Sequence, residues 1–284
     1  MALDALKPTI WSGALLKSLN DKLVYGQVCN RDYEGEIARF GDTVKISEIG
    51  AIAVRSYEST ATTALTIQQL DFASKLLHID RAKYAAFWVD DEDRAKAKGD
   101  FMVEALEKQA WAMANEIDEY IATFYGQAGI TITGTAAGGT DVSSTNTLKY
   151  LSLIAQKHDE ANTPMEGRWI VVPPWFYQKM LLAKIALDTS NSAMLANGSV
   201  GRFMNFDIYV SNNVYHGSGT DRAAIMSGYR GTISLAVQVT KTKMQESITI
   251  GFKTLVKSLM VYGCKVIRPN NLAVAWLDYK AEAT

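Results

Sequence analysis

The feature that most constrains this chain is a long run of apolar residues at helical spacing. Within residues 91–125 they recur every three or four positions, which places them on one face of an α-helix. This stripe, which we expect to be buried, consists of Met102, Leu106, Ala110, Met113, Ile117, Ile121 and Phe124. At ~1.5 Å per residue the helix would be about 50 Å long, far beyond the usual three to four turns.

An acidic cluster stands directly before this stripe and raises the question of a metal site. It consists of Asp90, Asp91, Glu92 and Asp93. Adjacent helical positions point apart, and no His or Cys lies close enough in sequence to complete a coordination sphere. Acids suit the positive end of a helix dipole, and Asp90 or Asp91 is expected to cap the helix by accepting a backbone N–H bond. We therefore interpret the cluster as a helix start, with Gly126 as the predicted end, and predict no metal there.

The composition describes a core-forming protein without a strong overall charge. Of 284 residues, 48% are hydrophobic, and 29 Lys and Arg against 30 Asp and Glu leave a formal net charge of -1. This balance disfavours binding to nucleic acid or an anionic membrane through a basic field. No apolar run approaches the ~20 residues that span a bilayer, and the N-terminal residues lack the apolar core of a signal peptide. We expect a cytoplasmic location and no membrane partner.

Known catalytic and cofactor motifs are incomplete in this sequence. Residues 134–140 have the glycine spacing of a phosphate loop but lack its Lys, and residues 217–222 lack the third glycine of a dinucleotide fingerprint. The histidines lie apart, without a GxSxG or HExxH motif. Cys29 and Cys264 lack CxxC spacing and are expected to be reduced, buried thiols. The sequence predicts no catalytic, cofactor-binding or metal-binding residues.

Upstream of the helix, residues 42–89 have the alternating pattern of a long two-stranded hairpin. Apolar residues alternate with polar ones on the outgoing limb, residues 59–69 form a Ser/Thr-rich tip, and the returning limb again has period two. Each limb of about 15 residues would reach about 50 Å at ~3.3 Å per residue. Because such a ribbon is only marginally stable alone, we expect it to lie along another subunit. The residues proposed for this contact are Tyr57, Glu58, Thr60, Thr63 and Gln68.

Beyond residue 127 the pattern changes to mixed helices and strands. A helical face begins after Asn146, which is expected to cap it, and a second helix is predicted from about Trp175. Short strands are predicted at residues 168–172, 206–211 and 222–227. The last apolar alternation, in residues 258–277, is expected to form paired strands that pack back under the long helix.

In this order, the features resemble the major capsid proteins of tailed bacteriophages, which have the Hong Kong ninety-seven type fold. The resemblance rests on an N-terminal arm, a hairpin closing at FWVDDEDRAKAKGD, an Ala-rich spine helix, a mixed α/β region and a terminal VYGCKVIRP. It implies an α+β fold with an axial and a peripheral domain. The implied divisions are residues 1–41 for the arm, 42–89 for the extended loop, 90–126 for the spine helix, 127–250 for the axial domain and 251–284 for strands returning to the peripheral domain.

The resemblance also implies a function. Such subunits assemble with themselves, as hexamers and pentamers, into an icosahedral shell that encloses double-stranded DNA without sequence-specific binding and without a cofactor. The short segment before the hairpin implies a separate scaffolding protein, and a portal is another expected partner. The implied location is the virion, after assembly in the host cytoplasm.

Two other functions fit parts of the sequence. An encapsulin-like nanocompartment shell would share the fold but enclose enzymes, and neighbouring genes would distinguish it from a phage shell. A soluble cytoplasmic enzyme would need a pocket with convergent polar groups and would run as a compact monomer or small oligomer on gel filtration.

Overall fold

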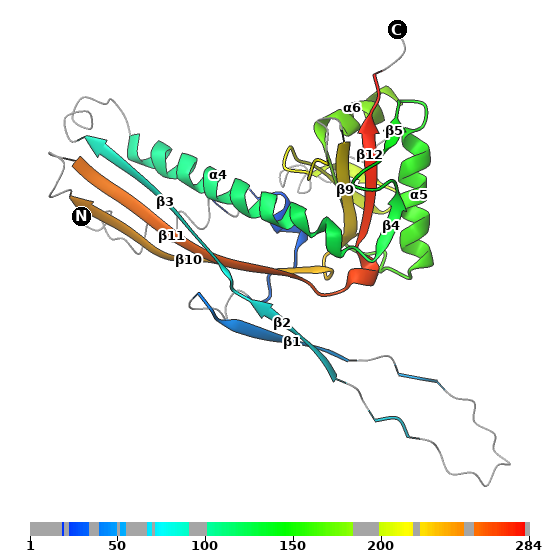
Figure 1. Ribbon diagram of the computed structural model, residues 1–284, viewed down its shortest axis with the longest axis horizontal. Coiled ribbons are helices and arrows are strands. Elements are labelled where there is room, and N and C mark those ends of the chain that lie inside the picture. The colour runs from blue at the N-terminus through cyan, green and yellow to red at the C-terminus, as the bar shows by residue number, and fades with distance from the viewer. Residues whose placement is uncertain are drawn as a thin grey trace.

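The computed structural model describes most of the chain (Figure 1). The described residues are 19, 23–33, 40–49, 52–54, 67–69, 72–90, 101–183, 199–217, 222–246 and 253–281. They form an elongated part, a compact part at one end of it, and a hairpin that projects from the region where the two meet (Figure 1).

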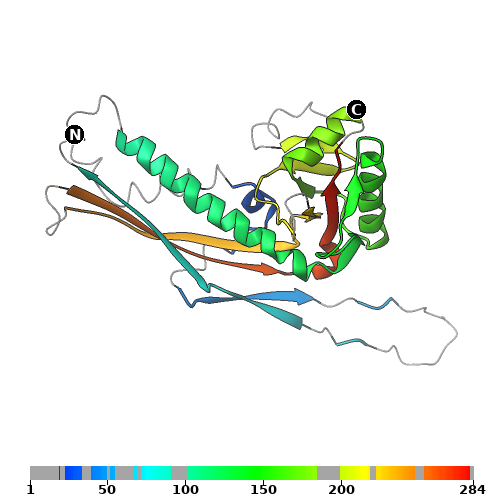
Figure 2. The ribbon, with the colours of Figure 1, turned by 45° about the horizontal axis from the view of Figure 1, so that its top comes forward.

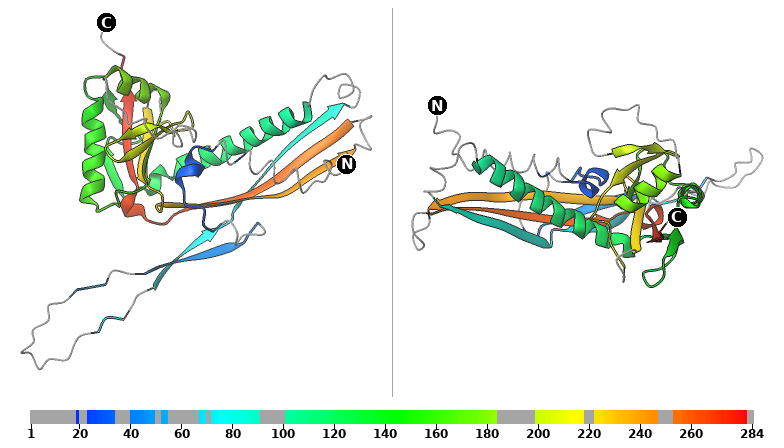
Figure 3. Two further views of the ribbon diagram at one scale, coloured as in Figure 1. Left: turned by 180° about the vertical axis from the view of Figure 1, so that it is seen from behind. Right: turned by 90° about the horizontal axis from the view of Figure 1, so that it is seen from above.

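The elongated part, which we call the long limb, consists of one sheet and one long helix. Its antiparallel strands are β3 (Arg81–Asp90), β10 (Ile233–Glu246) and β11 (Lys253–Val266), in the order β10-β11-β3. Helix α4 (Phe101–Ala122) lies along one face of this sheet (Figures 1 and 3). Because alternate residues of β11 face the helix, Met260 and Tyr262 join Ile117 and Ile121 in the largest hydrophobic core.

The compact part, which we call the compact lobe, is a seven-stranded sheet with helices on one face. Its strand order is β4-β12-β9-β6-β8-β7, and β5 also pairs with β12. These strands are β4 (Ile130–Thr133), β5 (Thr140–Val142), β6 (Arg168–Val172), β7 (Ser199–Phe203), β8 (Phe206–Val210), β9 (Arg222–Tyr229) and β12 (Ala273–Tyr279). Helices α5 (Thr147–Glu160) and α6 (Pro174–Leu182) cover one face, where Ile154 and Phe176 pack against Ile170 in a second core.

Local sequence explains the centre of this lobe. All five residues of β6 are buried, as expected for a strand flanked on both edges and covered on both faces. Pro173 lacks the N–H that would continue the ladder, and Pro174 opens α6 at its first turn. Asn146 occupies the N-cap position of α5 as predicted, but its Oδ1 accepts the Ser143 N–H at 2.8 Å and so holds the preceding turn instead of the helix.

A buried carboxylate attaches the N-terminal segment to the long helix. Helix α2 (Tyr25–Val28) packs against α4, and Asp118, 2% exposed, accepts the N–H groups of Val24 at 2.8 Å and Gly26 at 3.3 Å. These bonds satisfy N–H groups that a short helix leaves unpaired at its start. Burial raises the pKa of Asp118 to about 7.

The projecting hairpin is a separate antiparallel pair, β1 (Thr43–Ile49) with β2 (Phe72–His78). Its base packs on the sheet face opposite α4, where Val44 and Leu77 are buried with Val261. From there the hairpin extends away from both the long limb and the compact lobe (Figure 2).

The returning limb of the predicted hairpin is shorter than expected. The prediction carried the extended loop through residue 89, whereas pairing with β1 ends at His78 and β3 pairs with β11, Arg81 opposite Tyr262. The prediction of strand was correct for this segment, and the predicted partner was wrong for residues 81–89. Pairing with β11 gives β3 a face packed by α4, a stabilisation that a free two-stranded ribbon lacks.

Other predicted boundaries also differ. Strand β10 was placed in the axial domain but lies in the long limb, and β12 was placed with the returning strands but lies in the compact lobe. Of the two strands in residues 258–277 that were predicted to pack under α4, β11 does so and β12 does not. Apolar alternation identifies a strand but not the strand it pairs with. The long helix ends earlier than Tyr125: α4 stops at Ala122 and tightens into the 3₁₀ helix η3 (Thr123–Gln127), which contains Gly126.

Candidate interaction surfaces

One face of the long limb carries exposed aromatic side chains. We call the side of the β10-β11-β3 sheet opposite α4 the outer face. On β3, Ala85, Phe87 and Val89 occupy the positions that face α4, and the alternate positions face outward. Tyr84 and Trp88 occupy outward positions and are 79% and 59% exposed. Aromatic residues in such a row are enriched at protein–protein contacts.

The outer face is also basic. Lys243 and Lys257 stand directly opposite each other in the β10–β11 pair, and both are exposed. The Lys253 Nζ lies 3.8 Å from the centroid of the Trp88 ring, a favourable cation–π arrangement. Like charges opposite each other destabilise a strand pair. A partner that supplies carboxylates would therefore relieve the repulsion between these two lysines.

The hairpin exposes apolar side chains beyond β1 and β2. Ile52, Val54 and Ile67 are 70%, 98% and 90% exposed. The two arms are linked there, since the Ala53 N–H donates to Gln68 Oε1 at 3.0 Å. An arm that holds its apolar side chains in water gains stability when a second molecule covers them.

The predicted contact residues fall partly on this arm. Gln68 is exposed and lies on the described part of the hairpin. Tyr57, Glu58, Thr60 and Thr63 lie outside the described residues, so their role in an intersubunit contact stays a prediction.

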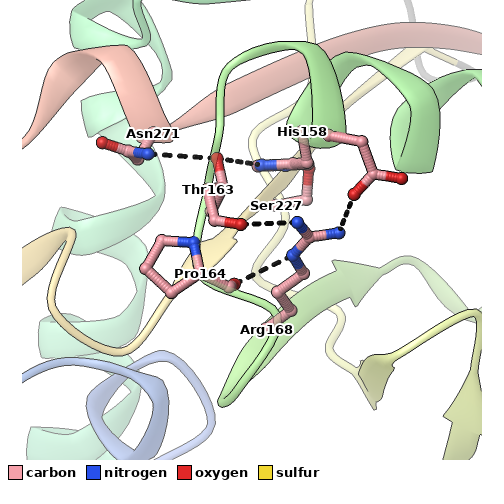
Figure 4. A network of polar contacts seen from close by, with 7 residues as sticks. His158, Thr163, Pro164, Arg168, Ser227 and Asn271 are labelled. Atoms are coloured by element: carbon pink, nitrogen blue, oxygen red, sulfur yellow. Dashed lines mark hydrogen bonds and ion pairs between the residues drawn. The ribbon is translucent and has the colours of Figure 1, made fainter.

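A buried polar network lies beside the loop that joins α5 to β6 (Figure 4). The His158 Nε2 is 2.9 Å from Ser227 Oγ, and its Nδ1 is 3.2 Å from Thr163 Oγ1. Arg168 donates to the Thr163 carbonyl at 2.6 Å and to Asp159 Oδ1 at 2.7 Å. Burial and, secondarily, the Arg168 charge lower the pKa of His158 to about 4. The imidazole is therefore neutral at pH 7, and both of its nitrogens are occupied.

The described residues contain few features of a small-molecule site. Within the described ranges, no group of three or more His, Cys, Asp or Glu side chains lies close enough to hold a metal ion. A groove of about 440 Å³ between β3 and α4 is lined mainly by apolar residues, with Lys108 and Gln109 as its charged and polar members. No helix in the described part of the chain is long and apolar enough to cross a membrane.

Comparison with protein families identifies the family of the chain that carries these surfaces. A family model described as "Phage capsid protein" matches residues 78–275, from the end of β2 into β12. The chain belongs to the phage capsid protein family. It is therefore a structural protein of the phage virion, the major capsid protein from which the shell is built. The match favours this function over the nanocompartment and the enzyme that the sequence alone left open.

Several solved structures share the fold of this capsid protein. The structure titled "Mycobacterium phage Che8" matches with a TM-score of 0.68 and 22% identity, covering 89% of this chain and 90% of that one. The capsid of cyanophage P-SCSP1u matches with a TM-score of 0.66 and 17% identity, covering 92% and 89%. A virus-like particle from Pyrococcus furiosus matches with a TM-score of 0.58 and 12% identity, covering 94% and 98%. Comparison with curated proteins gives no match. The predicted α+β capsid fold is confirmed.

The predicted helical stripe of the capsid protein lies largely in its core. Met113, Ile117 and Ile121 are at most 3% exposed and belong to the main hydrophobic core, whereas Leu106 is half-buried. Met102 belongs to α4, but the structure does not describe the position of its side chain, so its burial stays a prediction.

The predicted helix cap lies at the edge of the described residues. Asp90 is the last residue of β3, opposite Lys253, and α4 as described begins at Phe101. Residues 91–100 lie outside the described part of the chain, so the capping role of Asp90 stays a prediction. Asp91 lies outside the described residues, so its capping role stays a prediction.

Sequence reasoning missed the outer face of the capsid protein. The predicted hairpin includes Tyr84 and Trp88 in its returning limb, and this prediction does not indicate that they are exposed on a three-stranded sheet. Their spacing of four in a period-two strand already placed them on one face, together with Ala86. The basic part of the face was not recognisable, because β10 and β11 come together with β3 only in the folded chain.

Proposed function

We propose that this capsid protein tiles an icosahedral shell as hexamers and pentamers, and that its hairpin holds neighbouring subunits together. Support for this comes from the hairpin itself, whose arms carry Ile52, Val54 and Ile67 into solvent. Subunits that repeat one such contact around a closed lattice gain the same stabilisation at each step.

The outer face is the surface that we propose for the neighbour's hairpin. The base of each subunit's own hairpin already packs on this sheet face, through Val44 and Leu77 against Val261. Farther along the same face, Leu255 and Leu259 occupy outward positions of β11 opposite Trp88 and Tyr84. Apolar arms and a partly apolar face complement each other, and a standard stable contact buries about 1,600 Å².

The proposal also covers the partners of the capsid protein and the compartment in which it assembles. The near-neutral charge of -1 supports enclosing double-stranded DNA without sequence-specific binding, because a specific reader is usually strongly basic on its binding face. We further propose a separate scaffolding protein, a portal in the same shell, assembly in the host cytoplasm, and no enzymatic activity.

Shortening the hairpin tests the central claim. Replacing residues 56–68 by an Asn-Gly turn removes the tip but leaves β1, β2 and their packing on Val261 in place. We expect circular dichroism to remain close to that of the wild type, while sedimentation shows monomers or small oligomers instead of shells.

A matched control separates the apolar contact from the length of the loop. Val54→Ser with Ile67→Ser keeps the hairpin length and removes two exposed apolar side chains. It should raise the subunit concentration needed for assembly at least tenfold. Shells of normal yield from both variants at wild-type concentration would refute the hairpin as an assembly element.

A further inference from the structure

A cavity of about 290 Å³ lies where the N-terminal segment meets the compact lobe, and we call it the junction cavity. Part of its lining comes from α2 and the residues that follow it, and the rest comes from the lobe sheet and its loops. Sites that enclose a whole small molecule have volumes of ~300–1,000 Å³, so this cavity suits a group the size of one side chain. Its polar and charged lining residues are Gln27, Arg31, Trp169, Asp207, Tyr209 and Arg230.

Several of these side chains have no hydrogen-bond partner in the protein. Trp169 is 2% exposed, and its buried Nε1 donates to no acceptor in the part of the chain that the structure describes. Among the same described residues, the side chains of Gln27, Tyr209 and Arg230 also form no hydrogen bond. A buried donor without an acceptor costs free energy, which a bound group with acceptor atoms would recover.

The lining of the junction cavity contains more hydrogen-bond donors than acceptors. The indole N–H of Trp169 and the guanidinium of Arg230 only donate, and Asp207 is the one carboxylate among the described lining residues. The Arg202 Nε lies 3.6 Å from Asp207 Oδ1, so the negative charge of Asp207 already has a cation beside it. The chemical group that fits such a lining is an oxyanion, a carboxylate or a phosphate, which a guanidinium binds through charge-assisted hydrogen bonds.

Two features favour a carboxylate on a peptide over a phosphate of DNA. The Asp207 Oδ1 is buried and accepts no hydrogen bond from the described residues. The backbone N–H groups that flank an acidic side chain supply a donor for it, whereas a DNA phosphodiester has none. The Trp169 N–H is also recessed. An acidic side chain enters a recess end-on, whereas a phosphate in a duplex is tied to the strand on both sides.

The chain itself carries a peptide of this chemistry. The acidic cluster, residues 90–93, is the only run of four acids in the sequence. It is too far from the junction cavity of its own subunit, because Asp90 ends β3 at the tip of the long limb (Figure 1). Arg81, at the other end of β3, lies against Tyr120 near the lobe, and the two ends of β3 are about 30 Å apart at ~3.3 Å per residue. The acidic cluster of a second copy has no such limit.

We propose that the junction cavity binds a carboxylate of the acidic cluster from a second copy of the chain, with Arg230 and the Trp169 N–H as its donors. This inference rests on the proposed assembly of identical subunits and concerns a different contact from that of the hairpin. Every copy carries the cluster and the cavity at separate places, so the contact is head-to-tail and repeats from one copy to the next.

A peptide of residues 87–100 tests the cavity on the full-length subunit, held below the concentration at which it assembles. Titration calorimetry should show binding that weakens at least tenfold in Arg230→Gln and in Trp169→Phe, which removes the N–H and keeps an aromatic ring. Trp175→Phe is the matched control, because the Trp175 Nε1 is likewise buried and unpartnered but lies on α6, outside the cavity. It should bind the peptide as the wild type does.

The same titration gives the contrary outcomes. A peptide with Asn and Gln in place of its four cluster acids should not bind. Absence of binding by the natural peptide, or wild-type binding by both Arg230→Gln and Trp169→Phe, would overturn the proposal. Displacement of the peptide by a double-stranded oligonucleotide in the wild type, and not in Arg230→Gln, would assign the cavity to phosphate instead.

A charge exchange tests whether the contact joins two copies. Arg230→Glu, and Glu92→Lys combined with Asp93→Lys, should each raise the concentration needed for shells at least tenfold. All three changes in one chain should recover at least half of that loss on a logarithmic scale, because each new lysine meets a neighbour's new glutamate. Absence of recovery would refute the contact between copies. If wild-type subunits form no shells, the proposed assembly fails, and the peptide titration still decides what the cavity binds.

Discussion

His158 illustrates how a single buried side chain makes stability depend on pH. The ring lies fully buried between the hydroxyls of Thr163 and Ser227, with the Arg168 guanidinium nearby. Burial disfavours the protonated ring, and the Arg168 cation adds to this effect, which together lower the pKa of His158 to about 4 from an ordinary value of 6.5. Asp159 opposes this effect but lies toward solvent.

The sign of the resulting pH dependence follows from that shift. Between pH 6.5 and about 4 the unfolded chain binds a proton at this residue and the folded chain does not, so stability falls as the pH is lowered through this window. We expect a loss on the order of 3 kcal/mol by pH 4. Urea unfolding of the wild type and of His158→Gln at several pH values isolates this contribution from that of the carboxylates. Parallel curves for the two proteins would contradict the assignment.

At the scale of elements, short buried strands and helices were predictable and long-range pairings were not. Residues 168–172 were predicted as a buried strand and form β6. A short apolar run that ends at two consecutive prolines is too short for a helix and favours a strand. Residues 81–89 were correctly predicted as extended, but their partner β11 lies far along the chain. The period of a strand shows which of its faces is apolar, but it does not show which other strand lies beside it.

Helix α4 offers a test of how strictly its inward face is buried. Ile117 is fully buried in the main core, so Ile117→Asp would place an unpaired charge there at a cost of several kcal/mol. We expect this variant to be insoluble or unfolded on expression. Ala112→Asp introduces the same charge on the exposed side of the same helix and should cost about 1 kcal/mol or less. Soluble yield and circular dichroism compare the two variants, and equal losses would show that charge on the helix matters more than burial.

At the scale of the whole molecule, an elongated subunit exposes surfaces that its own fold leaves uncovered. The sequence indicated the capsid fold through its resemblance to phage capsid proteins, which rests on five features in order: arm, hairpin, long helix, mixed α/β region and terminal strands. The division between limb and lobe was not predictable, because β10 and β12 each lie in a different sheet from the one that their sequence neighbours suggested. The outer face appears only once β3, β10 and β11 are assembled.

A double-mutant cycle tests whether this face receives a neighbour's hairpin. Trp88→Ala and Val54→Ala each remove an exposed apolar side chain, so each should change subunit stability by less than about 1 kcal/mol. Both should raise the concentration at which shells form, as measured by light scattering. If Trp88 and Val54 of neighbouring subunits contact each other, the two effects should be less than additive, because the second substitution finds the contact already lost.

Trp111 provides the matched control for this cycle. It is 59% exposed, like Trp88, but it lies on α4, on the opposite side of the sheet from the outer face. Trp111→Ala combined with Val54→Ala should therefore give additive effects on the assembly concentration, whatever Trp111 contributes by itself. Additive effects in the Trp88 cycle as well would mean that the hairpin docks elsewhere. Coupling of Val54 to Trp111 and not to Trp88 would move the docking surface to the helical side of the long limb.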